Sequence, residues 1–497
     1  MSELALAIRR TDPSDPVSAY NAGLKALRQG FEEEGLKLLE AARRAAPANA
    51  KLWQVAGLLH RKLDELAPAI AMLEEAARLD PRDPLIAHTL ARAHLEAGLP
   101  SIRHFQAARR LAPADPDVLL GLVAAVEEEV GPKAAVETLE LLIASNPTWI
   151  AGLEVLMRLR WQCGDRDGFT ADYERALSSE PRNIALWRSL ILALVPADQY
   201  ERALELVLRG RREAGPHLLF DANEAVCRAE LGQSEQAETL FARLDELDDP
   251  KIRVRQVRHL LRTGRPAEAA ALAESMTKKP GAFFFWPYLS IAWRLLDDPR
   301  WEWLEGDPRL VGIYDLDLPS IDALAERLRA LHRTTHQPLE QSVRGGTQTQ
   351  GILFSRIEPE IRSLRAAVVR AVEAHIAQLP APQSDHPQLG EPRDRRVRFA
   401  GSWSVRLTGG GHHANHIHPA GWFSSALYVA LPEAEPPAGW LTLGVPQAEL
   451  GIALPPIRQV EPKPGRLVLF PSTLWHGTVP FEAGERLTVA FDVARPI

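Results

Sequence analysis

Prolines recur through the first 290 residues of this chain at nearly constant intervals, and this period constrains the fold more than any other feature. The intervals are 34, 34, 32, 34, 34, 35, 34 and 30 residues, between Pro13, Pro47, Pro81, Pro113, Pro147, Pro181, Pro216, Pro250 and Pro280. A period near 34 residues is typical of helix–turn–helix units that stack into a solenoid. One unit cannot bury its own apolar face, so its neighbours supply the core. The period therefore predicts a helical solenoid over residues 13–290.

One unit carries a nearly complete repeat signature. Small residues stand where two helices must approach closely, and bulky residues fill the space between them. The signature positions are Trp53, Ala56, Gly57, Ala69, Leu73, Ala76 and Pro81. At these offsets the unit resembles a tetratricopeptide repeat, and other units keep fewer of the positions. The resemblance implies a concave groove for a protein or peptide partner; the alternative is a scaffold without a ligand.

An aromatic segment follows the repeats, whose period ends at Pro280–Gly281. It contains Trp286, Trp293, Trp301 and Trp303. A surface that stacks nucleic-acid bases would interleave aromatic residues with Lys and Arg, but acidic residues dominate here. We therefore predict that residues 291–317 form a capping and linker segment that seals the last repeat and contacts the next domain.

The pattern changes in residues 318–497. Helical patterns cover 320–333 and 357–379, and after residue 397 short apolar runs alternate with turn residues. Such runs are typical of a β-sandwich or barrel. The chain is therefore predicted to be an α + β multidomain protein, with an N-terminal α-solenoid and a C-terminal β domain that has flanking helices.

Histidines cluster in this C-terminal region. The segment HHANHIHP contains His412, His413, His416 and His418; His476 follows 58 residues after His418, and Arg486 ten residues later. Side chains two apart on a strand share one face, so His416 and His418 point the same way. A histidine pair, a distant third histidine and a basic residue on the last strand indicate a non-haem iron site that also holds a dicarboxylate.

The wider sequence around these histidines resembles a bacterial and phage group of 2-oxoglutarate/Fe(II) oxygenases, over about residues 318–497. The shared pattern is H-x-H-P, S-x-x-x-Y, F-P-S, H and a final R-x-S/T. The resemblance implies a double-stranded β-helix (jelly-roll), with Fe(II) as metal and 2-oxoglutarate as co-substrate. It assigns metal binding to His416, His418 and His476, and binding of the far carboxylate of 2-oxoglutarate to Arg486, Thr488 and Tyr428.

One position departs from the wider superfamily. The second metal ligand is usually a carboxylate, in a triad of two histidines and one carboxylate; here the position is His418. Three possibilities follow: His418 binds the metal directly, it holds a water in the ligand position, or the site is metal-poor and inactive. Trp403 and Trp422 are candidates to shield the site from water, and Arg406 either contacts substrate or is an exposed strand residue.

Composition narrows the partners. The net charge of −7 argues against nucleic acid, because such a chain has no general attraction to phosphates. The two cysteines, Cys163 and Cys227, exclude a disulfide framework and are expected to be buried thiols. The first residues do not resemble a secretory signal, and no apolar run is long enough to span a bilayer. We therefore expect a cytoplasmic protein without a membrane partner.

These observations predict a 2-oxoglutarate- and Fe(II)-dependent dioxygenase that hydroxylates a protein or peptide presented by the repeats. Two alternatives stay open. One is an interaction scaffold whose jelly-roll has lost turnover, and the other is an oxygenase that acts on a small metabolite.

Overall fold

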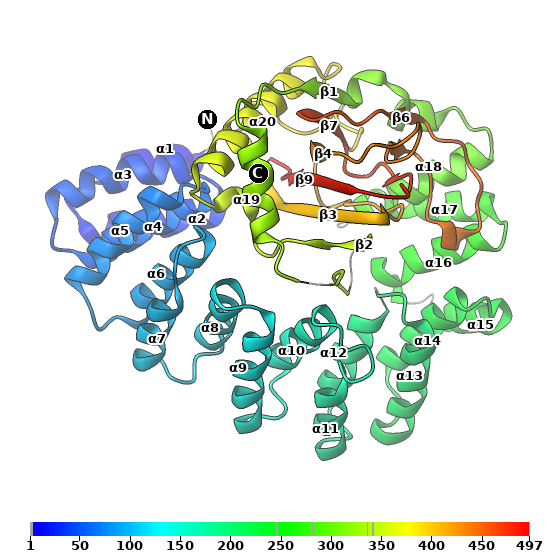
Figure 1. Ribbon diagram of the computed structural model, residues 1–497, viewed down its shortest axis with the longest axis horizontal. Coiled ribbons are helices and arrows are strands. Elements are labelled where there is room, and N and C mark those ends of the chain that lie inside the picture. The colour runs from blue at the N-terminus through cyan, green and yellow to red at the C-terminus, as the bar shows by residue number, and fades with distance from the viewer. Residues whose placement is uncertain are drawn as a thin grey trace. The chain divides into compact units, whose positions relative to one another are not determined.

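The computed structural model describes residues 3–195, 197–244, 247–279, 282–334, 336–339 and 342–496, and Figure 1 shows its elements. The protein forms two compact units. The first contains Met1–Leu139 and Gln350–Ala366, and the second contains Glu140–Thr349 and Ala367–Pro496. Pro280 and Gly281, the predicted end of the repeats, lie outside the described ranges.

The repeat region is a succession of helices that pack pairwise against their neighbours in the chain. They are α1 (Glu3–Arg10), α2 (Pro16–Gln29), α3 (Glu32–Ala45), α4 (Ala50–Lys62), α5 (Leu66–Leu79), α6 (Pro84–Glu96), α7 (Ile102–Leu111), α8 (Pro116–Glu129), α9 (Pro132–Ser145), α10 (Ile150–Gln162), α11 (Ala171–Ser179), α12 (Ile184–Leu194), α13 (Tyr200–Ala214), α14 (Leu218–Glu230), α15 (Ser234–Leu244), α16 (Pro250–Arg262) and α17 (Pro266–Met276).

The periodic prolines mark where the first helix of each pair begins. Five of them are followed two residues later by an Asp or Asn whose side chain caps the next helix. Asp83, for example, accepts hydrogen bonds from the backbone N–H groups of Leu85 and Ile86 at 2.9 and 3.0 Å. Such caps satisfy backbone donors that have no partner inside the helix. The capping residues are Asp15, Asn49, Asp83, Asp115 and Asn183.

The close approach predicted for small residues is present between α4 and α5. A Cβ atom added to Gly57 would lie 2.6 Å from Cγ of Leu73 and 3.2 Å from the carbonyl oxygen of Ala69. Glycine at this position therefore lets the two helices of the pair come together, and Leu73 fills the contact with its side chain fully buried.

The first unit also contains a segment from the C-terminal half of the chain. The backbone N–H of Ile357 donates to Ala97 at 3.2 Å, and the Ser355 hydroxyl donates to Asp64 at 3.2 Å. Arg356 pairs with Glu128 at 2.8 Å. The early repeats thus bind a stretch of their own chain through the ends of their helices.

The second unit contains two antiparallel sheets. The order of the six-stranded sheet is β1 (Gly312–Asp315), β7 (Arg466–Pro471), β4 (Phe423–Ala430), β9 (Glu485–Val493), β3 (Phe399–His413) and β2 (Val343–Gln348). The order of the three-stranded sheet is β6 (Arg458–Val460), β5 (Leu441–Leu443) and β8 (His476–Thr478). The fold class is therefore as predicted: helical repeats followed by an antiparallel β domain.

Two predicted helices flank the sheets, and the predicted linker supplies an edge strand of the larger one. The predicted helices 320–333 and 357–379 are present as α19 (Ile321–Leu331) and α20 (Pro359–Gln378). Strand β1 comes from the predicted linker 291–317 and pairs with β7 at the edge of the larger sheet. The linker thus contributes a strand to the β domain.

The last repeats and the β domain share one hydrophobic core. Residues of α16, α17 and α18 (Trp286–Leu295) pack in one cluster with Leu450 and Trp475. The indole N–H of Trp475 donates to the carbonyl of Pro287 at 3.1 Å, and Arg294 donates to the carbonyl of Pro455 at 2.6 Å. Residues of α18 therefore contact both the last repeats and the β domain.

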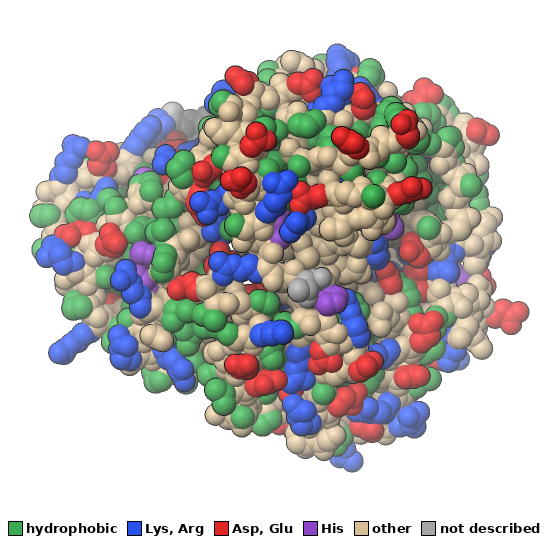
Figure 2. Space-filling view, in the orientation of Figure 1, with side chains coloured by type: hydrophobic (Ala, Val, Ile, Leu, Met, Phe, Trp, Pro, Cys, Tyr) green, Lys and Arg blue, Asp and Glu red, His purple; other side chains and the backbone are tan. Residues whose placement is uncertain are grey.

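The surface is mixed in charge. Figure 2 shows basic and acidic side chains interspersed over the visible face. Within the described ranges, no helix is both long and apolar enough to cross a membrane. Of the two cysteines, Cys227 is buried and Cys163 is partly exposed.

Candidate active site

Three histidines meet between the two sheets. His416 follows β3, and its backbone pairs with that of His476 on β8: His416 N–H donates to the His476 carbonyl at 2.9 Å, and the return bond is 3.0 Å. His418 lies two residues further on, anchored by a bond from its N–H to the Ser472 carbonyl at 3.0 Å. The nitrogen atoms that these three side chains can offer to a metal lie within 4.8 Å of one another.

Each of the three imidazole rings has an oxygen partner at Nδ1. His416 Nδ1 lies 2.8 Å from the Ala414 carbonyl, His476 Nδ1 lies 3.0 Å from the Leu474 carbonyl, and His418 Nδ1 lies 2.9 Å from a carboxylate oxygen of Asp492. A carbonyl or carboxylate accepts hydrogen bonds, so Nδ1 carries the proton in each ring. The three Nε2 atoms are therefore left with lone pairs, which is the form in which histidine binds a metal.

Burial keeps the rings of His416 and His476 neutral. It lowers the pKa of His416 to about 3, and the adjacent His418 adds to the effect. The pKa of His476 is well below its ordinary value for the same reason, with further contributions from His416 and His418. A neutral imidazole can coordinate a cation without first losing a proton.

Arg486 lies on β9 in the same cavity. It is 1% exposed, and its Nε atom has no hydrogen-bond partner within the part of the chain that the structure describes. Burial lowers the pKa of Arg486, and the adjacent Tyr428 only partly offsets this. A buried guanidinium is costly unless it is paired with an anion. The cavity thus offers a fixed positive group to a carboxylate.

Thr488 and Tyr428 accompany Arg486. Thr488 lines the cavity, and its hydroxyl has a long contact of 3.5 Å with the Val405 carbonyl. Tyr428 pairs with Thr488 across β4 and β9, and its ring lies 5.0 Å from the guanidinium carbon of Arg486. The buried Tyr428 hydroxyl has no partner among the described residues, although the residue itself lies behind the cavity wall.

The cavity takes its walls from both sheets. His416, His418, His476, Arg486 and Thr488 all line it. The structure therefore brings together five of the six residues that the sequence assigned to metal and co-substrate, and places the sixth, Tyr428, beside them.

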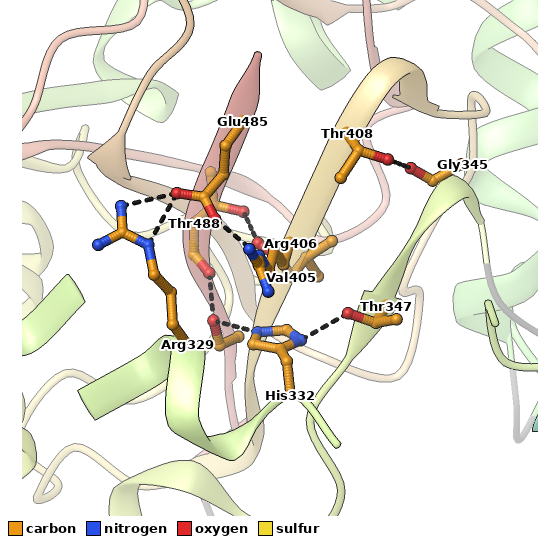
Figure 3. Close-up of polar contacts among 10 residues, drawn as sticks. Arg329, His332, Gly345, Thr347, Val405, Arg406, Thr408, Glu485 and Thr488 are labelled. Atoms are coloured by element: carbon orange, nitrogen blue, oxygen red, sulfur yellow. Dashed lines mark hydrogen bonds and ion pairs between the residues drawn. The ribbon is translucent and has the colours of Figure 1, made fainter. Parts of the chain in front are cut away.

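The remaining candidates have different positions. Trp403 lines the cavity and stacks on His418, with ring centroids 5.6 Å apart, and His413 lines it as well. Trp422 is buried, and its indole N–H donates to the Gln388 carbonyl at 2.9 Å, away from the cavity lining. Arg406 lies on the opposite face of the sheet and pairs with Glu485 at 2.6 Å (Figure 3). Arg406 is therefore a partly exposed strand residue that does not line the cavity.

Sequence reasoning missed Asp492. On β9 every second side chain faces the cavity, in the order Arg486, Thr488, Ala490 and Asp492. Continuing the alternation from Arg486 would have found this carboxylate. Its relation to His418 could not be found in this way, because the two residues are 74 positions apart.

The residues present fit the two groups that the resemblance implies. Three Nε2 lone pairs converge on one region, as a metal ion requires. A buried guanidinium, which has no acidic partner within the described part of the chain, lines the same cavity, as a dicarboxylate requires. Imidazole ligands suit Fe(II) among several divalent metals, so the site does not by itself select iron.

Comparison with known families agrees with this geometry. A family model described as "Putative 2OG-Fe(II) oxygenase" matches residues 401–492, and a tetratricopeptide-repeat model matches residues 50–83. The chain thus contains a tetratricopeptide repeat and a domain similar to this oxygenase family. A search of curated proteins found no match.

Several solved structures resemble the repeats. The tetratricopeptide-repeat protein YrrB, described as having an unusual peptide-binding site, is 14% identical, covering 37% of this chain and 96% of its own, with a TM-score of 0.29. MamA from Desulfovibrio magneticus RS-1 is 17% identical over 37% of this chain and 98% of its own, with a TM-score of 0.29. A tetratricopeptide-repeat protein from Parabacteroides merdae ATCC 43184 is 16% identical, covering 48% of this chain and 94% of its own, with a TM-score of 0.30. Scores this low do not define a common arrangement of the repeats.

Proposed function

We propose that the protein is a 2-oxoglutarate- and Fe(II)-dependent dioxygenase. The observation that carries this proposal is the single cavity that is lined by three convergent imidazoles and by a buried arginine whose Nε atom has no partner among the described residues. The family match over residues 401–492 supports it.

In this proposal His416, His418 and His476 hold Fe(II) through Nε2, and Arg486 binds the far carboxylate of 2-oxoglutarate with help from Thr488 and Tyr428. When bound, the metal and co-substrate supply oxidising chemistry, in which O₂ converts 2-oxoglutarate to succinate and CO₂ and leaves one oxygen atom on the substrate. A planar guanidinium can hold both oxygens of a carboxylate, so Arg486 also sets the orientation of the co-substrate.

The rest of the cavity keeps water out of the site. Phe470 packs against His476 with ring centroids 4.6 Å apart, and Trp403 covers His418. Leu441 and Ala426 add apolar surface. Apolar walls strengthen the attraction between Arg486 and a carboxylate, because the pair is not screened by water.

For the substrate we propose a protein or peptide that the repeats bind. The tetratricopeptide-repeat match supports this choice, and so do the early repeats, which bind a segment of their own chain. An oxygenase that acts on a small metabolite, with repeats that serve assembly, is the competing substrate class.

The first test is metal-dependent turnover of 2-oxoglutarate. The full chain, supplied with Fe(II), ascorbate, O₂ and cell lysate, should form succinate, and His476→Ala should abolish this together with metal binding. His412→Ala is the matched control, because His412 belongs to the same histidine cluster but does not line the cavity. A wild-type protein that binds neither metal nor 2-oxoglutarate would instead be the inactive scaffold.

The second test identifies the substrate class. Mass spectrometry of the treated lysate should show a gain of one oxygen atom on particular peptides, dependent on 2-oxoglutarate and absent with His476→Ala. Oxygen gained by metabolites, with no change in the peptides, would support the small-molecule oxygenase.

A further inference from the structure

One of the three histidines of the site, His418, is hydrogen-bonded to the carboxylate of Asp492. Asp492 Oδ2 accepts the hydrogen bond from His418 Nδ1 at 2.9 Å, and the side chains of His418 and Asp492 are 21% and 13% exposed. The other two histidines have neutral backbone carbonyls at the same position. His418 is thus the one of the three rings whose partner brings a negative charge.

Asp492 is itself held in place. Its second oxygen, Oδ1, accepts a hydrogen bond from the Ser424 hydroxyl at 2.6 Å, and the Ser472 hydroxyl lies 3.0 Å from that of Ser424. Gly421 leaves room for this group: a Cβ atom there would lie 2.6 Å from Ser472 Oγ and 3.4 Å from Cβ of Asp492. Both carboxylate oxygens are therefore fixed, one by His418 and the other by Ser424.

Asp492 also changes the sum of formal charges in the proposed metal site. Fe(II) brings two positive charges and Arg486 one, and 2-oxoglutarate brings two negative charges. With three neutral imidazoles as ligands the sum is one positive charge. Among the described residues that line the cavity, Asp492 is the only acidic one, and its charge brings the sum to zero. A site with two histidines and a carboxylate ligand has the same sum.

We propose that Asp492 is a positioning residue that orients His418 toward the metal and supplies, through the ring, the negative charge that a carboxylate ligand would otherwise provide. This inference rests on the proposed function. A carboxylate that accepts a hydrogen bond from a metal-bound histidine fixes the ring and makes it a stronger base. The chain thus places a carboxylate one imidazole away from the metal.

The test is the full-length protein titrated with Co(II), and then with 2-oxoglutarate at saturating Co(II). Asp492→Asn keeps the shape and removes the charge. It should weaken Co(II) binding about 10- to 100-fold, as is typical for loss of such a partner. Affinity for 2-oxoglutarate should stay the same or rise a few-fold, because the site then carries more positive charge.

The opposite directions separate charge from structural damage. A merely structural role of Asp492 would weaken both the metal and 2-oxoglutarate, and that result would overturn the proposal. Ser424→Ala is the matched control: it removes a hydrogen bond to Asp492 but keeps the carboxylate, and should change Co(II) affinity far less. The absorption spectrum of bound Co(II) should shift with Asp492→Asn and stay close to wild type with Ser424→Ala.

Two further outcomes are decisive. If His418→Ala keeps the metal while Asp492→Ala loses it, Asp492 is a ligand and the positioning role is wrong. If wild-type protein binds Co(II) and Asp492→Asn binds it equally well, the inference fails while the proposed function stands. A wild-type protein that binds neither Co(II) nor 2-oxoglutarate overturns the proposed function as well.

Discussion

Strand β9 carries two adjacent charged residues whose surroundings are opposite. Glu485 faces outward, where Arg329 of α19 and Arg406 of β3 both pair with it at 2.6 Å (Figure 3). Arg486 faces inward, where it is buried and its Nε atom is unpaired in the described structure. Two consecutive residues of β9 thus differ: Glu485 is paired with two arginines, whereas the Nε atom of Arg486 has no partner among the described residues.

The difference distinguishes charges that stabilise from charges that bind. Burial would raise the pKa of Glu485, but hydrogen bonds from Arg329 and Arg406 outweigh it and hold the pKa below its ordinary value. No acidic group among the described residues pairs with Arg486, and burial lowers its pKa. Burying the Arg486 guanidinium costs free energy that its described neighbours do not fully offset. An anionic ligand in the cavity could offset the remainder.

The largest expected effect belongs to Arg486→Ala. It should weaken 2-oxoglutarate binding by about 2–5 kcal/mol, or roughly 30- to several-thousand-fold, because a desolvated arginine–carboxylate pair is lost. Metal affinity should survive, since Arg486 is not a ligand. Calorimetric titration of the Co(II)-loaded protein measures both.

Arg406→Ala is the control on the outer face of the sheet, and should leave 2-oxoglutarate affinity at the wild-type value. Equal 2-oxoglutarate affinity in Arg486→Ala and wild type would remove the contrast between the two faces.

The next largest effect is a loss of folding stability at acidic pH, caused by His332 on the outer face of the sheet. Burial and the charge of Arg406 lower the pKa of His332 to about 4, and its ring bridges Thr347 and Ser404 at 2.8 and 3.1 Å (Figure 3). The unfolded chain has a histidine pKa near 6.5, so it binds the proton more readily than the folded protein. Stability is therefore lost as pH falls from 6.5 toward 4, by about 2 kcal/mol from this residue.

Hydrogen exchange of the β2 and β3 amides, measured between pH 6.5 and 4.5, reports this local stability. His332→Asn should reduce its pH dependence relative to wild type, and an unchanged dependence would contradict the assignment. Other buried histidines, such as His375 with a pKa of about 4, add to the slope in both proteins, so the difference between them isolates His332.

A smaller effect, on the affinity for 2-oxoglutarate, is expected from Tyr428→Phe. The Tyr428 hydroxyl has no partner in the described structure and lies on the side of Arg486. If it donates to the bound carboxylate, its loss should weaken 2-oxoglutarate binding roughly tenfold, because a hydrogen bond to a charged group contributes about 1.5 kcal/mol or somewhat more. An affinity equal to wild type would limit carboxylate binding to Arg486 and Thr488.

The smallest effect is predicted for Glu485→Gln. Its two arginine partners are each 39% exposed, so solvent screens the pairs and about 1 kcal/mol or less of stability should be lost. Denaturation followed by tryptophan fluorescence should show this loss, and 2-oxoglutarate affinity should not change. A weaker 2-oxoglutarate affinity would show that the two faces of β9 are coupled.

Much of this site could be predicted because its residues are close in sequence or follow a strand pattern. Arg486 and Thr488 are two residues apart on β9 and therefore share a face. His416 and His418 have the same spacing but lie after β3, where backbone hydrogen bonds to His476 and Ser472 position them instead. The proline period likewise identified the repeats, since it marks the start of each helical pair.

What could not be predicted depends on contacts between distant segments. Asp492 meets His418 only because the loop after β3 crosses the end of β9. Arg406 has the same residue type as Arg486, and only the register of β3 against β9 shows that it faces outward. The period also says nothing of what packs on the repeats, and so the core that the last helices share with Leu450 and Trp475 was not foreseen in detail.

The position of Trp475 has a consequence for how the molecule responds to its ligands. It immediately precedes His476, its ring packs edge-on against Tyr288 of α18 at 5.5 Å, and its indole N–H is bonded to Pro287. A ligand that binds only the folded site adds its binding free energy to every element that must unfold with that site. Because helix α18 packs on the residue that precedes His476, we expect saturation with metal to raise the resistance of this helix to heat and protease, so that α18 reports occupation of the candidate site.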